Sequence, residues 1–171
     1  MIYLAPIQGI TDRIYRNLFP VYFKGVDMAI APFISLAKNM KPDNNLLCDL
    51  YPDRNKGIPT IPQIMSSAPD DFTKLANDLY DIGCGTVNWN IGCPFPMVVK
   101  KGQGAGMLCY PDRVESFLEK IVPDIKPKLS IKLRIGLKYP DEVLPLIPIF
   151  NQYPIEELII HPRTGVQMYE G

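Results

Sequence analysis

The chain has 171 residues, 47% hydrophobic and 21% charged, a composition typical of a globular protein of about one domain. No apolar run approaches the roughly 20 residues that span a bilayer. The N-terminus also lacks the regions of a signal peptide, so we expect a cytoplasmic protein with no membrane association. Eighteen basic and eighteen acidic residues cancel, which excludes a general attraction for nucleic acid and leaves that role to local patches.

Cysteine and histidine are too few and too widely spaced to predict a zinc site. The cysteines form no CxxC pair, and His161 is the only histidine. We therefore expect no metal. In a reducing compartment we expect four free thiols, at Cys48, Cys84, Cys93 and Cys109.

Short β-rich runs alternate with longer helical patterns along the chain. Six runs predict strands, at residues 2–7, 27–33, 60–65, 85–91, 129–135 and 156–161. Helical patterns lie between them, at residues 11–19 with Thr11 as the N-cap, 69–83 and 111–122. The segment 38–59 is polar and turn-rich, with a short helix expected near residues 46–50. This recurrence predicts an α/β fold with a parallel sheet.

Two parallel architectures fit this pattern. A doubly wound sheet would show a glycine-rich phosphate loop after its first strand, where this chain has only Gly9. Polar and reactive residues instead recur at the strand ends: Gln8, Gln63, Asn90, Cys93, Lys132, Arg134 and His161. That distribution favours a (β/α)8 TIM barrel, here incomplete with about six of its eight strands. We interpret the chain as the N-terminal part of a longer protein.

Cys93 follows a strand pattern and lies between Gly92 and Pro94. A free cysteine is often only a small buried hydrophobe, and that interpretation suffices for the other three. Around Cys93, the strand-end Asn90 and the Cys-Pro pair predict a stiff loop at the barrel mouth, where a thiol can meet a ligand. A thiol with a pKa of about 8.5 is mostly protonated at neutral pH, so general acid and nucleophile both remain open.

Lys132 alternates with Ile131 and Leu133, so its side chain points to the opposite face of the strand. A lysine that faces the barrel interior near its mouth would be a fixed cation for a phosphate, an anionic ring or an enolate oxygen. A strand-end salt bridge is the alternative.

Three further polar residues occupy comparable positions. Gln63 lies inside an apolar strand, where its amide needs partners from the protein or from the edge of a heterocycle. His161 ends a strand pattern, and it is either a structural residue or a site residue. Arg163 follows it and adds a planar set of donors.

Glycines alternate at Gly102, Gly104 and Gly106. The spacing lacks the full phosphate-binding signatures, so we expect a flexible loop that follows Cys93, one that would be able to carry the thiol over a substrate. Lys100 and Lys101 precede these glycines. They are either a solvated charge pair or substrate-binding residues that contact a phosphate.

Together these segments resemble the tRNA-dihydrouridine synthase family. The stretch "LAPIQGITDRIYR" resembles its opening motif, and "PQIMSSAPDDFTKLA" resembles its glutamine-bearing third strand and the helix after it. The stretch "VNWNIGCPFPMVVKKGQGAGML" resembles its signature around a Gly-Cys-Pro loop. "IKLRIG" and "IIHPRTGVQMYEG" resemble the motifs of its fifth and sixth strands, so five motifs occur in the family's order.

The resemblance implies a flavin-dependent (β/α)8 barrel in which NADPH reduces FMN and a hydride passes to C6 of a uracil in tRNA. By the same resemblance Cys93 would be the general acid that protonates C5, Asn90 would orient the base, and Arg163 would lie at the flavin or RNA edge. The residues implied in flavin binding are Ala5, Pro6 and Ile7 beneath the ring, with Gln63, Lys132 and His161 around it. A cation near the reduced ring and a thiol opposite it are chemically consistent with this reaction.

The chain departs from the family pattern in three ways. Asn88 stands where the family usually has Asp, and Pro162 where it commonly has Gly. Family members also continue through two more strands and a helical tRNA-binding domain, so residues 1–171 would be the N-terminal part of the catalytic barrel. Two alternatives stay open. One is a flavin-barrel reductase of a small pyrimidine, similar to dihydroorotate dehydrogenase, and the other is an inactive truncated fragment that dimerises through its open sheet edges.

Overall fold

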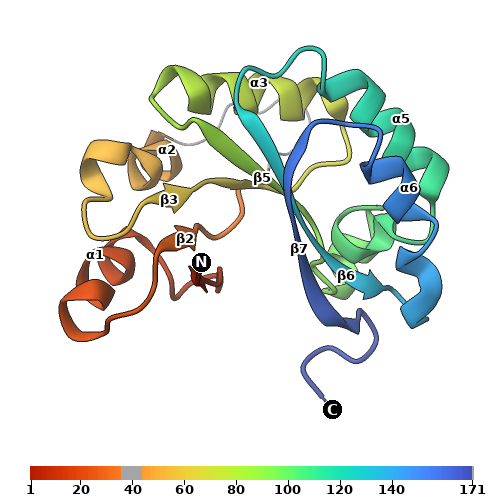
Figure 1. Ribbon diagram of the computed structural model, residues 1–171, viewed down its shortest axis with the longest axis horizontal. Coiled ribbons are helices and arrows are strands. Elements are labelled where there is room, and N and C mark those ends of the chain that lie inside the picture. The colour runs from red at the N-terminus through yellow and green to blue at the C-terminus, as the bar shows by residue number, and fades with distance from the viewer. Residues whose placement is uncertain (36–43, 171) are drawn as a thin grey trace.

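The computed structural model describes residues 1–35 and 44–170, and its strands are all parallel (Figure 1). The strands are β1 (Tyr3–Leu4), β2 (Met28–Ile30), β3 (Thr60–Ile61), β4 (Gln63–Ile64), β5 (Thr86–Ile91), β6 (Lys128–Gly136) and β7 (Ile155–Thr164). Each strand pairs with the next one in the sequence within two sheets, β1 to β3 and β4 to β7. The α/β prediction is confirmed, and the strands form part of a barrel.

The strand predicted at residues 60–65 is divided, so seven strand segments stand where we predicted six. Pro62 separates β3 from β4 and has no N–H to donate to a ladder. On either side of it β3 pairs with β2, whereas β4 pairs with β5. A bridge between Ile34 and Ile64 connects the two sheets into one curved layer.

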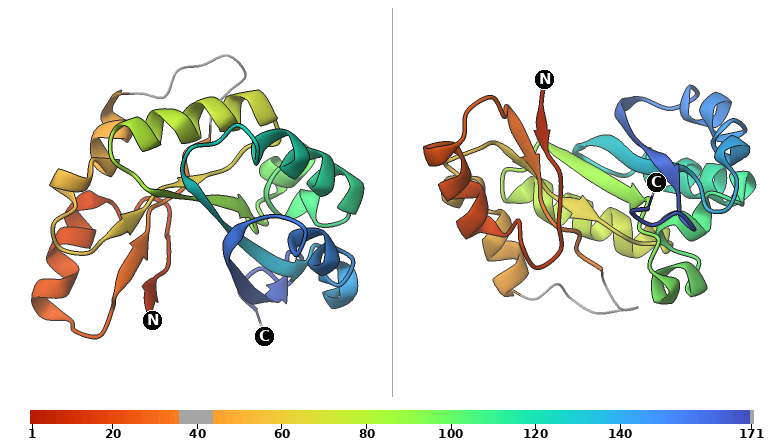
Figure 2. Two further views of the ribbon diagram at one scale, coloured as in Figure 1. Left: turned by 45° about the horizontal axis from the view of Figure 1, so that its top comes forward. Right: turned by 90° about the horizontal axis from the view of Figure 1, so that it is seen from below.

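The helices lie along the convex side of this curved layer, while the ends of the chain lie on its open side (Figure 2). They are α1 (Arg13–Tyr22), α2 (Asn44–Leu50), α3 (Pro69–Asp81), α4 (Pro96–Lys100), α5 (Pro111–Ile121) and α6 (Leu146–Phe150). All the helices predicted from the sequence are present. Part of the predicted turn-rich segment, residues 38–43, lies outside the described residues.

The N-cap of α1 is Asp12, not Thr11 as predicted. The Asp12 carboxylate accepts a hydrogen bond from the Tyr15 backbone N–H at 2.9 Å. The Thr11 hydroxyl instead accepts a hydrogen bond from the backbone N–H of Ile7, four residues earlier, at 2.9 Å. Thr11 therefore closes the turn between β1 and α1, and the aspartate that follows it begins the helix.

Side chains alternate strictly along β5 and β6, and this alternation separates the core from the site. One face of β5 carries Trp89, which stacks on Phe117 of α5 with the ring centroids 4.2 Å apart. Phe72 of α3 meets the same indole edge-on, and the indole N–H donates to the Ser66 carbonyl at 3.1 Å. The outer face of the sheet thus packs under α3 and α5, and the polar residues of both strands point inward.

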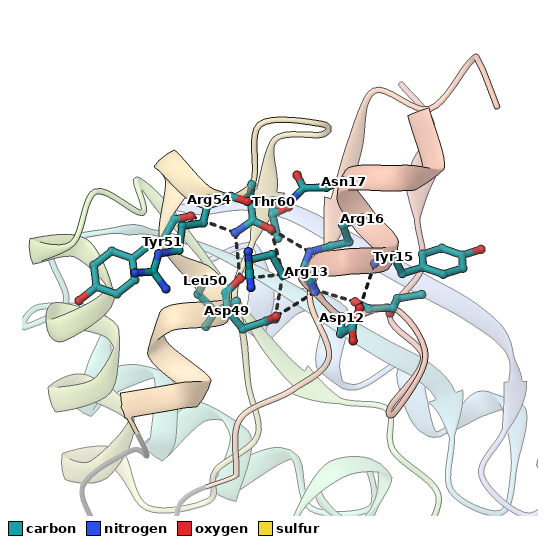
Figure 3. Close-up of polar contacts among 12 residues, drawn as sticks. Asp12, Arg13, Tyr15, Arg16, Asn17, Asp49, Leu50, Tyr51, Arg54 and Thr60 are labelled. Carbon is teal, nitrogen blue, oxygen red and sulfur yellow. Dashed lines mark hydrogen bonds and ion pairs between the residues drawn. The ribbon is translucent and has the colours of Figure 1, made fainter. Parts of the chain in front are cut away.

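A buried arginine fastens α1 to the segment around α2 (Figure 3). Arg16 is 0% exposed, and its guanidinium forms an ion pair with Asp49 at 2.9 Å. It also donates to the Asn55 side chain at 3.0 and 3.1 Å and to the Thr11 carbonyl at 2.7 Å. Every arm of the guanidinium is hydrogen-bonded, which offsets the cost of burying its charge.

Within residues 1–35 and 44–170, no helix is both long and apolar enough to cross a membrane. The same residues contain no group of three or more His, Cys, Asp or Glu side chains arranged to hold a metal ion.

Candidate active site

A cavity of about 230 Å³ lies at the carboxyl ends of the strands, and we call it the mouth cavity. It brings together seven of the predicted site residues: Pro6, Ile7, Gln63, Asn90, Cys93, Lys132 and His161. Its other lining residues are Gln8, Pro32, Phe33, Gly92, Pro94, Phe95, Arg134 and Tyr169. In parallel α/β folds this end of the sheet is where ligands bind.

A chain of hydrogen bonds between side chains crosses the floor of the mouth cavity. Asn90 Oδ1 accepts from the backbone N–H groups of Gly92 and Cys93, each at 3.0 Å. Because those donors require an oxygen, Asn90 Nδ2 faces Gln63 and donates to its Oε1 at 2.8 Å. Gln63 Nε2 in turn donates to Asn88 Oδ1 at 2.7 Å.

Asn88 Nδ2 completes the series by donating to Ser130 Oγ at 2.8 Å. We call Ser130, Asn88, Gln63 and Asn90 the amide relay. The backbone donors at one end fix the orientation of every amide along it, because each NH2 group must meet an oxygen. Gln63 and Asn90 also line the mouth cavity, so two members of the relay adjoin the space that a ligand would occupy.

Cys93 is 8% exposed and lines the mouth cavity, as the sequence predicted. Burial raises the pKa of its thiol, although a backbone hydrogen bond from Phe95 and the charge of Arg134 both act to lower it. The balance is a thiol that keeps its proton at neutral pH. Its environment is therefore suited to proton donation.

Part of the glycine-containing segment after Cys93 is buried and packs against the cysteine, so the flexible loop predicted there is wrong. Residues Gly104–Met107 form a buried 3-10 turn. The Ala105 N–H donates to the Cys93 carbonyl at 2.9 Å. At Gly104 the backbone has φ +54°, and a Cβ atom would lie 2.5 Å from the Cys93 carbonyl oxygen. The glycine is needed for this close approach, which holds the cysteine loop in place.

Positive side chains line the part of the mouth cavity formed by β6. Lys132 stands beside Asn90 in the β5–β6 ladder, and Arg134 stands beside His161 in the β6–β7 ladder. Burial lowers the pKa of Lys132, and Arg134 lowers it further. Burial also lowers the pKa of His161 below 6.5, with added effects from Arg134, Lys132 and Arg163. The imidazole is therefore neutral at pH 7, and this part of the cavity favours an anionic or carbonyl-rich ligand edge.

Arg134 is the main residue of the site to which the sequence assigned no role. It is 2% exposed and donates to the carbonyls of Gly92, Thr164 and Met168 at 3.1, 2.8 and 2.8 Å. Its guanidinium also lies 5.6 Å from the centre of the Tyr169 ring. Arg134 lies on the same face of the strand as Lys132, so the alternation of residues in the sequence is sufficient to predict its inward position. The alternation does not predict its contacts with the cysteine loop and with residues 164–169.

Four predicted site residues lie outside the lining of the mouth cavity. Ala5 is exposed at the end of β1, and Arg163 lies on β7 close enough to affect His161. Lys100 and Lys101 line a second cavity beyond α4. The first motif thus contributes Pro6 and Ile7 to the mouth cavity, without Ala5.

Comparison with known proteins agrees with the motifs. The family model described as dihydrouridine synthase (Dus) matches residues 3–171. The tRNA-dihydrouridine synthase B of Pasteurella multocida is 31% identical over 99% of this chain and 51% of that protein. The corresponding proteins of Vibrio cholerae and Proteus vulgaris are 30% and 31% identical over 98% of this chain, and over 52% and 51% of their own lengths.

The chain therefore spans about half the length of the curated relatives that it matches. The family model nevertheless covers nearly the whole chain. It is on this coverage that we assign the chain to the dihydrouridine synthase family.

Proposed function

We propose that this chain carries the residues that reduce uridines in tRNA to 5,6-dihydrouridine, with FMN as cofactor and NADPH as reductant. The observation that carries the proposal is that Cys93, Lys132 and the amide relay meet in one cavity at the strand ends. The printed names of the relatives, which are tRNA-dihydrouridine synthases, support the same reaction.

The mouth cavity fits a flat heterocycle. Part of its lining is apolar and includes Pro6, Ile7, Pro32 and Phe33. Another part contains amide groups of the relay and the Lys132 ammonium group, which match the carbonyl and anionic edge of a flavin ring. Pro6 and Ile7 would lie beneath the ring, and Gln63, Lys132 and His161 would contact its edge. The chemistry that FMN would supply there, when bound and reduced by NADPH, is a hydride for C6 of the uracil.

Cys93 acts in this proposal as the general acid. Its raised pKa keeps the proton on sulfur at neutral pH, and the thiol donates that proton to C5 of the uracil. The thiolate that remains regains a proton from water. Asn90 holds the cysteine loop through two backbone N–H groups, and in this proposal its side chain also orients the base.

The cations divide between the two ligands. Burial lowers the pKa of Lys132 because it disfavours the charged ammonium group. An anionic ring edge would stabilise that charged form, so it would bind more tightly than a neutral edge. Arg163, beside His161, is assigned to the flavin or RNA edge. Lys100 and Lys101, on the far side of α4, are assigned to the RNA.

A reductase of small pyrimidines, similar to dihydroorotate dehydrogenase, is the second candidate. It would use the same mouth cavity, but it would not need cations beyond α4. Incubation with free pyrimidines and with unmodified tRNA separates the two candidates, because our proposal requires turnover of the tRNA alone.

Residues 1–171 form, in our proposal, the N-terminal part of the catalytic barrel, and the helical tRNA-binding domain belongs to another segment. The strand order ends at β1 and β7, whose outer edges have no partner within the described residues. Unpaired edges favour association with another strand, so we expect dimers of the isolated chain. Light scattering that finds only monomers would contradict this expectation.

Removal of the Cys93 thiol tests the proposed reaction. In the longest protein that the gene encodes, Cys93→Ala should abolish dihydrouridine formation in unmodified tRNA while flavin stays bound. Cys48→Ala, which removes a partly buried thiol in α2 that lines neither the mouth cavity nor the cavity containing Lys100 and Lys101, is the matched control and should keep its activity. Full activity of Cys93→Ala would refute the role of Cys93 as the acid.

A further inference from the structure

A second and larger cavity lies on the other side of α4, and we call it the rim cavity. Its volume is about 620 Å³, and it lies between α4, the start of α5 and the loop after β6. Its lining comprises Val99, Lys100, Lys101, Gly102, Gly106, Cys109, Tyr110, Arg113, Leu137, Lys138 and Glu142. Because these segments follow β5 and β6, the rim cavity opens at the same end of the barrel as the mouth cavity.

The charges of the rim cavity are strongly unbalanced. Four cations line it, Lys100, Lys101, Arg113 and Lys138, against the single carboxylate of Glu142. Within residues 1–35 and 44–170, none of these cations forms an ion pair with a carboxylate, in contrast to Arg16, Lys126 and Lys128. The cationic charge is therefore available to a ligand.

The one carboxylate is already engaged by the protein. Glu142 Oε2 accepts from the backbone N–H groups of Leu137 and Lys138, and the Cys109 thiol lies 3.6 Å from the same oxygen. These contacts fasten the loop after β6. One carboxylate stands against four cations, so the lining keeps a net positive charge.

Arg113 is held in a defined position at the wall of the rim cavity. Its guanidinium lies 5.4 Å from the centre of the Tyr110 ring. A Cβ atom at Gly102 would lie 3.0 Å from Arg113 Nη2, so the guanidinium reaches this backbone because residue 102 is glycine. A guanidinium positioned in this way loses less entropy when it binds an oxyanion with its planar donors.

We propose that the rim cavity binds a phosphate group, namely a backbone phosphate of the RNA whose base enters the mouth cavity. The RNA source rests on the proposed function, whereas the affinity for phosphate rests on the four cations that line the rim cavity. Helix α4 connects the two linings, and its five residues span about 7.5 Å. Phe95 lines one cavity and Val99 lines the other. A base and a neighbouring phosphate of one strand can therefore occupy both.

This arrangement divides the work of recognition. Phosphate contacts fix the position of a nucleic acid, and base contacts carry its sequence information. In the present chain the rim cavity would hold the strand in register while the mouth cavity receives the base. Arg113 and Lys138 would then be RNA-binding residues that contact neither the reacting base nor the cofactor.

The test uses the 171-residue chain and a short fluorescein-labelled oligouridylate, followed by fluorescence anisotropy at several salt concentrations. Arg113→Gln and Lys138→Gln should each weaken binding by about tenfold, and each should lower the salt dependence by about one phosphate contact. Lys126→Gln and Lys128→Gln are the matched controls, because they remove the same charge from exposed ion pairs at the start of β6. The controls should bind like the unchanged protein.

Competition with UMP and with inorganic phosphate identifies the source of the phosphate. Weak competition by both supports RNA, whereas UMP that binds as tightly as the oligouridylate would overturn the RNA assignment in favour of a mononucleotide. Equal binding by the rim variants and the controls would overturn the phosphate site itself. A separate FMN titration keeps the two proposals distinct, because a chain that fails to bind FMN but still shows the Arg113 effect refutes only the proposed function.

Discussion

The amide relay makes a quantitative prediction for Asn88→Leu. This substitution preserves the approximate volume of a fully buried side chain but removes the acceptor of Gln63 Nε2 and the donor to Ser130 Oγ. A buried donor left without a partner costs about 1–3 kcal/mol, and the loss at Ser130 adds a smaller amount. We expect a loss of about 3 kcal/mol in the free energy of unfolding. For a chain of this length that corresponds to a melting temperature lower by roughly 6–12 °C.

The relay also predicts an effect at Cys93 that general destabilisation does not. When Gln63 loses its orientation, Asn90 is held less firmly, and so is the cysteine loop that it anchors. Alkylation of Cys93, measured by mass spectrometry of its peptide, should become about fivefold faster for each ~1 kcal/mol lost at that anchor.

Asn55→Leu is the matched control for the relay. It removes another buried amide, which lies in the Arg16 network, and it should lower the melting temperature without changing the alkylation of Cys93. Equal alkylation rates in the Asn88 and Asn55 variants would refute the relay as the support of the cysteine loop. A melting temperature unchanged in Asn88→Leu would refute the magnitude.

Three further predictions concern the thiols, the buried ion pair and the close-packed glycine. Burial raises the pKa of Cys84 to about 11, and it also raises the pKa of Cys93. The stability that these thiols contribute is therefore present below their ordinary pKa and is lost as the pH rises through their pKa values in the folded protein. Urea midpoints should fall at alkaline pH, and they should fall less steeply in Cys84→Ala. If Cys84→Ala left the pH dependence of the urea midpoint unchanged, this would contradict the contribution assigned to the Cys84 thiol. Arg16→Met leaves the partly buried Asp49 carboxylate unpaired and should lower the free energy of unfolding by about 3 kcal/mol in urea titrations, whereas a loss below about 1 kcal/mol would show that the network contributes little. Gly104→Ala forces a Cβ atom toward the Cys93 carbonyl at a positive φ, so it should lower the melting temperature and speed Cys93 alkylation; normal values for both would refute the packing argument.

Local patterns in the sequence predicted the strands that form the site. The alternation of apolar and polar residues in 129–135 predicted that Lys132 faces away from Ile131 and Leu133. Asn88 and Asn90 alternate with apolar residues in β5 in the same way. Each of these positions depends on the period of a single strand. The parallel pairing of β5 with β6 then brought the two sets of side chains into register.

Contacts between distant segments were not predictable in the same way. Three glycines after Cys93 are compatible with a mobile loop until their close neighbours are known, which are the Arg113 guanidinium and the carbonyls of Cys93 and Val99. The role of Arg16 is not visible in the local sequence, because its partners Asp49 and Asn55 lie more than thirty residues away. Thr11 and Asp12 are both good N-caps, and only the backbone geometry selects the aspartate.

The most direct test of the account is an FMN titration of the 171-residue chain, followed by flavin fluorescence, with Lys132→Met and Lys128→Met beside it. Our account predicts saturable binding that Lys132→Met weakens by about tenfold and that Lys128→Met, at the exposed start of the same strand, leaves unchanged. Absence of binding, or binding that is the same in all three proteins, would contradict the claim that the mouth cavity holds the flavin ring.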